Sequence, residues 1–209
     1  MSDDVKMTRS EELRLKERIE LAESGHDILE KKRDGLIHEF MEIVGEAKSV
    51  NEELAENYIE AREKFRMAKI YDGEDTIKAA ALSVKETPQI SSTTQNIMGV
   101  VVPEISTEKS IRKNLLDREY SFSSSSSRID STAEKYEELL ESIVDAAETQ
   151  TRILKLLQEI EKTKRRVNAL EHKVIPELET SLDAVSQGLE EREREETFRM
   201  KKIKEMNSQ

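Results

Sequence analysis

A helical pattern that continues without a convincing stop through residues 131–205 most constrains how this chain can fold. Its apolar residues follow one another at steps of three and four, the spacing of a helix that buries one narrow seam against a partner helix. They are Leu139, Ile143, Ala146, Ile153, Leu157, Ile160, Val167, Leu170, Val174, Leu178, Leu182, Val185 and Leu189. Because roughly seven heptads make a helix too long for one compact globular domain, its partner must be sought elsewhere in the chain.

A second heptad pattern covers residues 8–71. Thr8 forms a T-x-x-E capping box with Glu11 at its start, and Asp72-Gly73 supplies a stop at its end. We expect the phase to slip by one after Leu54, which would bring Tyr58 and Phe65 into the seam. The seam positions are Leu15, Ile19, Ala22, His26, Leu29, Arg33, Leu36, Phe40, Ile43, Ala47, Val50, Leu54, Ala61 and Ala68.

The two helical segments lie at opposite ends of the sequence, and residues 72–130 connect them. A parallel pair would need the connection to run back along the helices, so the simplest arrangement is antiparallel. The sequence therefore predicts a mainly α fold, in which the N- and C-terminal helices form a long antiparallel two-helix coiled coil with a small β-hairpin in the middle. Arg33 is expected to fall near Glu171 to Glu177 in this register, where it could form an ion pair.

The connection changes in composition. Residues 82–105 are rich in β-branched and turn residues, and the valines at 100–102 are followed by Pro103. This segment predicts a small β-hairpin at about 82–105, in which Leu82 and Val84 alternate with polar neighbours.

The remaining predictions concern the start of the last helix and several short segments of the chain. Residues 109–118 are expected to form one or two helical turns, and residues 121–127, SFSSSSS, read as a flexible linker. Ser131 with Glu134 forms a second capping box, which predicts the start of the last helix. Residues 1–7 and 206–209 are expected to be short tails.

Two kinds of residue disturb the helical segments. Gly25, Gly35 and Gly45 lie beside the seam of the first segment, and each costs roughly 1 kcal/mol relative to Ala in a helix interior. They indicate either tolerated flexibility or the close approach of another protein's backbone. Pro176 lies inside the last segment and is expected to bend it.

The composition excludes several classes of function. Charged residues make up 38% of the chain, apolar residues 35% and aromatic residues 4%, a balance typical of long helices with a thin seam. The net charge of −11 argues against a nucleic-acid partner, and the lack of Cys excludes disulfides and thiol chemistry. No apolar run approaches the ~18 residues that would span a bilayer, and the N-terminus lacks a signal peptide's apolar core. We expect a cytoplasmic chain unless a partner holds it at a membrane.

No catalytic, cofactor-binding or metal-binding residue is expected. His26 is a seam position, typical of a packed core histidine, and His38 and His172 have no second ligand at metal-binding spacing. The carboxylates are spread along helices beside Lys and Arg, as on a solvated face. The basic residues near the C-terminus either complement the helix dipole or contact an acidic partner surface.

Three segments resemble a known family. Residues 8–40, TRSEELRLKERIELAESGHDILEKKRDGLIHEF, resemble the N-terminal helix of the D subunit of archaeal and vacuolar-type rotary ATP synthases. Residues 96–105, NIMGVVVPEI, and residues 162–179, KTKRRVNALEHKVIPELE, resemble the middle and the last helix of the same family. The resemblance runs from near Thr8 to about Lys204.

The resemblance implies a non-catalytic central-stalk rotor subunit, a shaft that carries rotation between a membrane ring driven by protons or sodium ions and the nucleotide sites. It implies four partners: the catalytic A and B subunits around one end of the coiled coil, and the F and C subunits at the other end. Its place would be the cytoplasmic face of the membrane. The expected bearing residues are Leu13, Leu15, Phe198, Met200 and Ile203, and the expected stalk-partner docking residues are Ile97, Met98, Val100 and Val102.

Two alternatives remain open from the sequence. A prefoldin-type chaperone also pairs terminal helices across a β-hairpin middle, although its helices are shorter than the segments expected here. A coiled-coil scaffold could use the seam for oligomerisation. An elongated monomer in solution would favour the shaft, whereas a compact hexamer would favour the chaperone.

Overall fold

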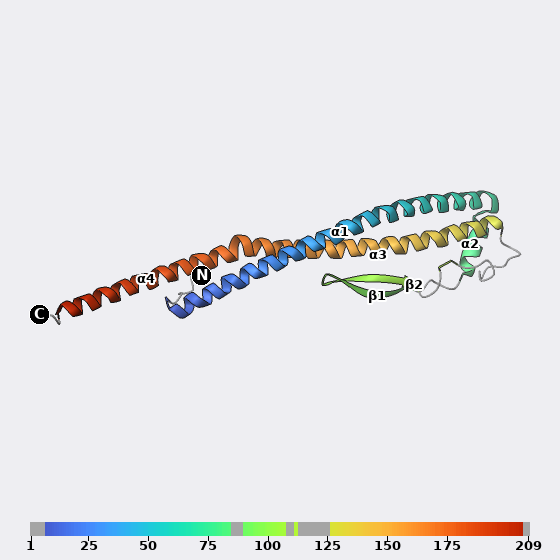
Figure 1. Ribbon diagram of the computed structural model, residues 1–209. Helices are drawn as coiled ribbons and strands as arrows, with labels where there is room; N and C mark the ends of the chain where they lie inside the picture. The colour runs from blue at the N-terminus through green and yellow to red at the C-terminus, as the bar shows by residue number, and fades with distance from the viewer. Residues whose placement is uncertain (1–6, 85–89, 108–110, 113–125, 207–209) are drawn as a thin grey trace. The chain divides into compact units, whose positions relative to one another are not determined.

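The computed structural model describes the chain except residues 1–6, 85–89, 108–110, 113–125 and 207–209. The elements in chain order are α1 (Arg9–Asp72), α2 (Glu74–Ser83), β1 (Ile90–Ile97), β2 (Val100–Thr107), α3 (Ser127–Ala169), the π-helical turn η2 (Leu170–Val174) and α4 (Ile175–Met206) (Figure 1). The chain divides into two compact units, and α1 and α3 contribute to both. The terminal unit comprises Met1–Gly35 with Ile160–Gln209, and the central unit comprises Leu36–Glu159.

In the terminal unit, the first half of α1 pairs with the chain from the end of α3 to α4. Arg9 forms an ion pair with Glu193, and further along α1 the His26 Nε2 atom lies 3.9 Å from the Glu171 carboxylate. Positions that rise along α1 therefore meet positions that fall along the partner, so the pair is antiparallel. Its buried seam residues are Leu15, Val167 and Val185, with Thr163.

In the central unit, the second half of α1 pairs with α3 in the same antiparallel sense. The Asn57 amide donates a hydrogen bond of 2.6 Å to the Ser142 hydroxyl, and the Glu60 carboxylate lies 2.9 Å from Lys135. The seam is mainly apolar on both sides of this polar pair, although Thr132 and Thr149 are also buried. Its fully buried or nearly buried residues include Leu36, Ile43, Ala47, Ala61, Ala68, Leu139, Ala146 and Leu156. The predicted mainly α fold, with antiparallel pairing of the two long segments, is confirmed.

Both ends of α1 follow the sequence signals. The Thr8 hydroxyl accepts a hydrogen bond from the Glu11 amide at 3.3 Å, which satisfies one free N–H of the first turn. α1 ends at Asp72, and Gly73 has a φ of 83°, a left-handed conformation that favours glycine. The expected phase slip after Leu54 is wrong. Ala61 and Ala68 are fully buried and Tyr58 is 54% exposed, so the original heptad phase continues.

The last long helix begins earlier than its expected cap. α3 starts at Ser127, and the Ser126 hydroxyl accepts a hydrogen bond from the Ile129 amide. The same hydroxyl donates to the Asp72 carboxylate at 2.8 Å, which ties the start of α3 to the end of α1. Ser131 therefore lies inside the helix rather than at its N-cap. Residues 113–118 and 121–125, expected to include helical turns and a linker, lie outside the described residues.

The hairpin forms, but over a shorter range than expected. β1 pairs with β2 in antiparallel register from Ile90↔Thr107 to Ile97↔Val100. Met98 and Gly99 form the turn with positive φ angles of 49° and 86°, and the Asn96 side chain accepts a hydrogen bond from the Gly99 amide. The expected start at residue 82 is wrong, because Leu82 lies in the helix α2.

Helix α2 was not foreseen, although its sequence EDTIKAAALS carries a helix signature. Glu74 and Asp75 lie in its first turn, where they complement the helix dipole, and three consecutive alanines follow. Only its last two residues, Leu82 and Ser83, fell within the predicted hairpin; the rest of α2 was left without an assigned element.

Pro176 interrupts the regular helix before it. The Ile175 amide donates to the Leu170 carbonyl, five residues back, and residues Leu170–Val174 form a π-helical turn. A proline ring clashes with the carbonyl four residues earlier in a regular α-helix, and the wider turn accommodates it. The sequence located this interruption correctly, and the π-turn is its physical form.

Two glycines in α1 provide a test of intrinsic helix propensity. A Cβ atom built at Gly25 or Gly45 has no heavy atom within 4 Å apart from its own local helix backbone. We expect Gly25→Ala and Gly45→Ala each to raise the free energy of unfolding by about 1 kcal/mol, measured by urea denaturation.

The matched control for these substitutions is Gly73→Ala. Gly73 also has open space around it, but its positive φ strains an L-residue by about 1–2 kcal/mol. We therefore expect Gly73→Ala to destabilise the protein. Loss of stability in Gly25→Ala would mean that the helix propensity argument fails at that position.

Candidate interaction surfaces

The described residues present helix surfaces and a hairpin, and two kinds of site were sought among them. No group of three or more His, Cys, Asp or Glu side chains among them could hold a metal ion. No helix in this described part of the chain is long and apolar enough to cross a membrane. The exposed apolar residues and the polar contacts of the two units are described next.

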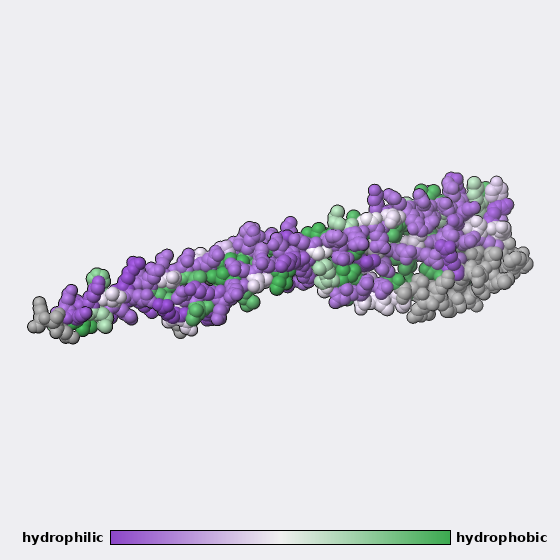
Figure 2. Space-filling model, viewed as in Figure 1, coloured by the Kyte–Doolittle hydropathy of each residue, from purple (hydrophilic) through white to green (hydrophobic). Residues whose placement is uncertain are grey.

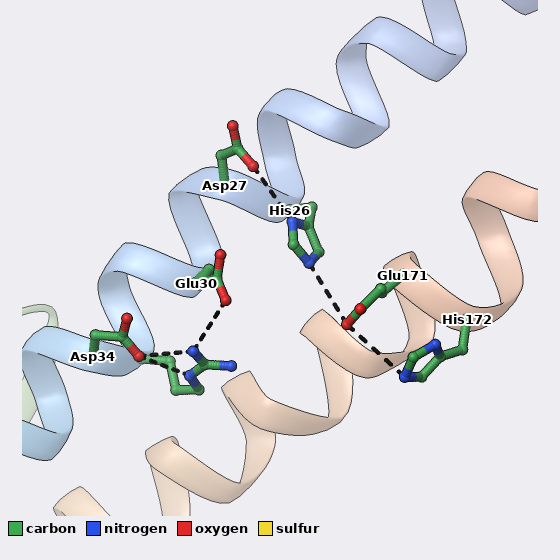
Figure 3. Close-up of polar contacts among 7 residues, drawn as sticks. His26, Asp27, Glu30, Asp34, Glu171 and His172 are labelled. Carbon is green, nitrogen blue, oxygen red and sulfur yellow. Dashed lines mark hydrogen bonds and ion pairs between the residues drawn. The ribbon is translucent and has the colours of Figure 1, made fainter.

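His26 is a polar residue within the seam of the terminal unit. Its side chain is 19% exposed, its Nδ1 atom lies 3.4 Å from the Asp27 carboxylate, and its Nε2 atom points toward Glu171 on the partner helix (Figure 3). His172 lies 3.9 Å from the same Glu171 carboxylate. The histidine is thus packed between the helices, as the sequence predicted for a seam position.

The expected ion pair of Arg33 with Glu171 to Glu177 is wrong. Arg33 instead contacts Glu30 at 3.1 Å and Asp34 at 2.8 Å, both on α1 (Figure 3). These carboxylates hold the pKa of Arg33 above its ordinary value, with the Asp34 hydrogen bond as the largest cause. The register places His26 opposite Glu171. Arg33 comes seven residues after His26 on α1, so in an antiparallel pair it faces residues that precede Glu171 in the sequence.

The end of α4 is exposed on every side. Residues 191–206 are all exposed, while Arg9, the first residue of α1, already pairs with Glu193. Among the described residues of the terminal unit, no other helix accompanies α4 beyond this ion pair. Phe198, Met200, Ile203 and Met206 are between 54% and 77% exposed there. Figure 2 shows small hydrophobic areas in the mostly hydrophilic surface near this end.

The expected bearing residues divide into two groups. Phe198, Met200 and Ile203 lie on the projecting end of α4, and Leu13 is 62% exposed on α1. Leu15 is only 4% exposed because it packs in the seam of the terminal unit. Its side chain supports the pair instead of facing outward. Met206, which was not among the expected residues, is also exposed on the same end of α4, at 70%.

The expected docking residues of the hairpin also differ in burial. Val100 is 8% exposed and Val102 is fully buried, so these side chains face the protein's own core. Met98 is 47% exposed at the turn, and Val101 is 59% exposed on the outer face of β2. Strand alternation explains the division, since successive side chains point to opposite faces. A run of three valines in the sequence does not show which face of the strand is buried, so the outward direction of Val101 could not be predicted.

The hairpin is anchored to an acidic edge of α3. The Ile105 amide donates a hydrogen bond of 2.9 Å to the Glu148 carboxylate, and Arg112 contacts Glu141 at 2.8 Å. Burial raises the pKa of Asp145 above its ordinary value of 3.8, and the neighbouring charges of Glu148, Glu141 and Glu53 raise it further. The part of α3 that holds the hairpin therefore carries several carboxylates close together.

The burial of Asp145 among other carboxylates predicts that Asp145→Asn raises the free energy of unfolding by an amount that depends on pH. A carboxyl with a raised pKa binds its proton more tightly in the folded state, so its ionisation at neutral pH costs stability. We expect Asp145→Asn to raise the free energy of unfolding at pH 7 by less than about 1 kcal/mol, since solvent screens a partly exposed charge. The gain should shrink as the pH falls through the raised pKa toward 3.8. A pH-independent gain, seen in urea titrations at several pH values, would contradict the electrostatic explanation.

Comparisons with known proteins identify the family. The sequence profile of the ATP synthase D subunits matches residues 11–205. The A-type ATP synthase D subunit of Haloarcula marismortui is 52% identical over 98% of this chain and 88% of its own length. The D subunit of Methanoregula boonei is 52% identical over 98% of both chains, and that of Methanosarcina acetivorans is 51% identical over 96% of both. The chain therefore belongs to the family of ATP synthase D subunits.

Proposed function

We propose that this chain is the rotor shaft in the central stalk of an A-type ATP synthase. As a member of the D-subunit family it is a stalk subunit of the ATP synthase complex and is not itself catalytic. The shaft would transmit rotation between an ion-driven membrane ring and a catalytic hexamer, so that ATP is made from ADP and phosphate. The family relationship carries this proposal, and the paired helices of each unit support it.

Paired helices suit a torque-bearing element. In each unit α1 is held to its partner by a buried seam and by ion pairs between the two helices. Lys135 lies between Glu138 at 2.8 Å and Glu60 at 2.9 Å, and these carboxylates raise its pKa to about 12. A two-helix cross-section has no three-fold symmetry. Rotation would therefore present a different face to each catalytic interface and change the relative stability of its conformations.

We assign the partners by the exposed surfaces. The projecting end of α4, with Phe198, Met200 and Ile203, would bear against the catalytic A and B subunits. The outer face of the hairpin, with Met98 and Val101, would dock the F and C subunits of the stalk. The complex would lie at the cytoplasmic face of the membrane, driven by either H⁺ or Na⁺. The chaperone and scaffold alternatives are not favoured by the family relationship.

Co-purification tests this function. We expect an affinity-tagged chain, expressed in its own organism at native level, to bring down a nucleotide-binding hexamer and a small stalk protein in fixed stoichiometry. A tagged unrelated coiled coil of similar charge serves as the control. Recovery of the chain as a free hexamer of itself, with no nucleotide-binding partner, would contradict the rotor assignment.

A further inference from the structure

The two strands of the hairpin differ in what their outer edges face. The hairpin lies beside α3, and the Ile105 amide of β2 donates a hydrogen bond of 2.9 Å to the Glu148 carboxylate of that helix (Figure 1). A strand amide that points toward α3 points away from β1, so α3 covers the outer edge of β2 at this residue. The other edge of the two-stranded sheet belongs to β1.

The register shows which backbone groups of β1 point outward. Hydrogen-bonded and non-hydrogen-bonded residue pairs alternate along an antiparallel ladder. Ile97↔Val100 closes a two-residue turn and is therefore a hydrogen-bonded pair. Ser92 lies opposite Ile105, whose amide points to α3, so this pair is not hydrogen-bonded. Both observations give the same alternation, in which the outward residues of β1 are Ser92, Thr94 and Asn96.

The edge of β2 is blocked, whereas the edge of β1 is open. Pro103 lies opposite Thr94 in a pair that is not hydrogen-bonded, so the N–H that proline lacks is one that would point outward from β2. Strand β1 has no proline and no charged residue, and residues 92–96 are all exposed. In the part of the chain that the structure describes, no backbone hydrogen bond joins an outward residue of β1 to a residue outside the hairpin.

The geometry of this open edge specifies the conformation of whatever covers it. Outward N–H and C=O groups at every second residue match the repeat of another β-strand and not that of a helix. Natural proteins block exposed strand edges with proline, charge or a covering element, because an open edge pairs with other chains. This protein applies two of these devices to β2 and none to β1. The occupant of the β1 edge is therefore an extended segment.

An exposed carboxylate beside β1 adds a charge requirement. The Glu104 side chain of β2 reaches across to β1, where it accepts a hydrogen bond from the Thr93 hydroxyl at 3.4 Å. No cation pairs with Glu104 among the described residues. A second copy that paired through its own β1 would bring no Lys or Arg in residues 90–97, and its net charge of −11 would repel the first. A different protein with a basic residue suits the edge better.

We propose that β1 binds an extended segment of another protein as a third strand of the hairpin sheet. The main chain of that segment would bond to the outward groups of Ser92, Thr94 and Asn96, and its side chains along β1 would be uncharged except for a Lys or Arg beside Thr93, within reach of Glu104. Main-chain bonds would supply affinity and the cation would supply specificity. The inference rests on the proposed function only in that the segment is sought within the assembled ATP synthase.

Residue-resolved hydrogen exchange tests the backbone pairing. The amides of Thr93 and Gln95 bond to β2, so they should exchange slowly both in the isolated chain and in the assembled complex. The amides of Thr94 and Asn96 point outward. We expect them to exchange at least about tenfold more slowly in the assembled complex than in the isolated chain. Equal exchange of these outward amides in the two states would overturn the proposal.

Photocross-linking in the assembled complex tests the identity of the occupant. The chain has no Cys, so Ser92→Cys accepts a benzophenone maleimide at a single site. We expect the adduct to contain one segment of another protein, with uncharged residues beside a Lys or Arg. The control is Leu82→Cys on α2, which is 84% exposed but does not lie on the strand edge. It should not reach that segment.

Two substitutions separate the backbone bonds from the charge. Thr94→Pro removes an outward N–H without removing a bond to β2, and it should lower the adduct yield at least about tenfold, whereas Thr94→Ala keeps the amide and should preserve the yield. Slow exchange of the Gln95 amide in the isolated proline variant verifies that the hairpin is intact. Glu104→Lys leaves every backbone bond in place and should also lower the yield, because like charges repel, while Glu104→Asp should retain most of it.

Four cross-linking results would overturn the proposal: adducts within this chain, adducts with a second copy, adducts with a segment that lacks Lys and Arg, or no adduct at all. The rotor function has a separate test. Recovery of a nucleotide-binding hexamer with unprotected β1 amides would refute the strand addition and leave the rotor function standing. A strand supplied by a protein outside ATP synthase would support the binding edge and contradict the rotor function.

Discussion

Leu156→Ala is expected to lower the free energy of unfolding by about 3 kcal/mol, the typical cost of removing a fully buried leucine side chain. Leu156 has no exposed surface and lies in the seam of the central unit, whereas Leu157, the seam residue expected from the sequence, is 40% exposed. The substitution removes apolar area from the contact and leaves a cavity that the helices cannot close without moving. Urea denaturation followed by circular dichroism at 222 nm measures the change.

Leu154→Ala supplies the control on the same helix. Leu154 is 57% exposed, so its replacement should change the stability of the isolated chain by less than about 0.5 kcal/mol. Equal effects of the two substitutions would show that the seam does not separate buried from exposed positions as described. A change in the denaturant slope for Leu156→Ala alone would indicate a less compact native or unfolded state.

The triple substitution of Phe198, Met200 and Ile203 by Ala is expected to reduce gradient-driven ATP synthesis by at least about tenfold. Loss of a hydrophobic interface anchor costs roughly 1–2 kcal/mol, and 1.4 kcal/mol corresponds to a factor of ten. The three side chains lie on the exposed end of α4. Alanine favours helix, so α4 should persist and lose only its apolar contacts.

Two measurements separate this bearing role from a structural one. The stability of the isolated chain should be unchanged, because the three side chains are at least 54% exposed. ATP synthesis in vesicles that contain the assembled complex should fall. Replacement of Lys201, Lys202 and Lys204 by Gln keeps the apolar residues and tests whether charge contributes instead. Normal synthesis by the triple-alanine variant would remove the basis for placing the bearing on α4.

Local signals identified the elements whose cause lies close by in sequence. Thr8 and Gly73 mark the ends of α1 because the cap and the left-handed residue act on adjacent backbone groups. Pro176 marks the π-helical turn for the same reason, since its ring clashes one turn back. The Ser131 capping box failed because Ser126, five residues earlier, offers a cap that also bonds to Asp72 on another helix.

The sequence by itself determined the mainly α fold, the antiparallel pairing and the family, because heptad spacing and specific motifs extend over nearly the whole chain. Only the tertiary structure decided the seam phase after Leu54, the partners of Arg33 and the burial of Val100 and Val102. Each of these depends on which side chain lies opposite in space. The heptad spacing in a sequence still reads as a helix when the seam is shifted by one position. The packed seam does not tolerate such a shift, because it would move buried alanines out of the seam and exposed aromatic residues into it.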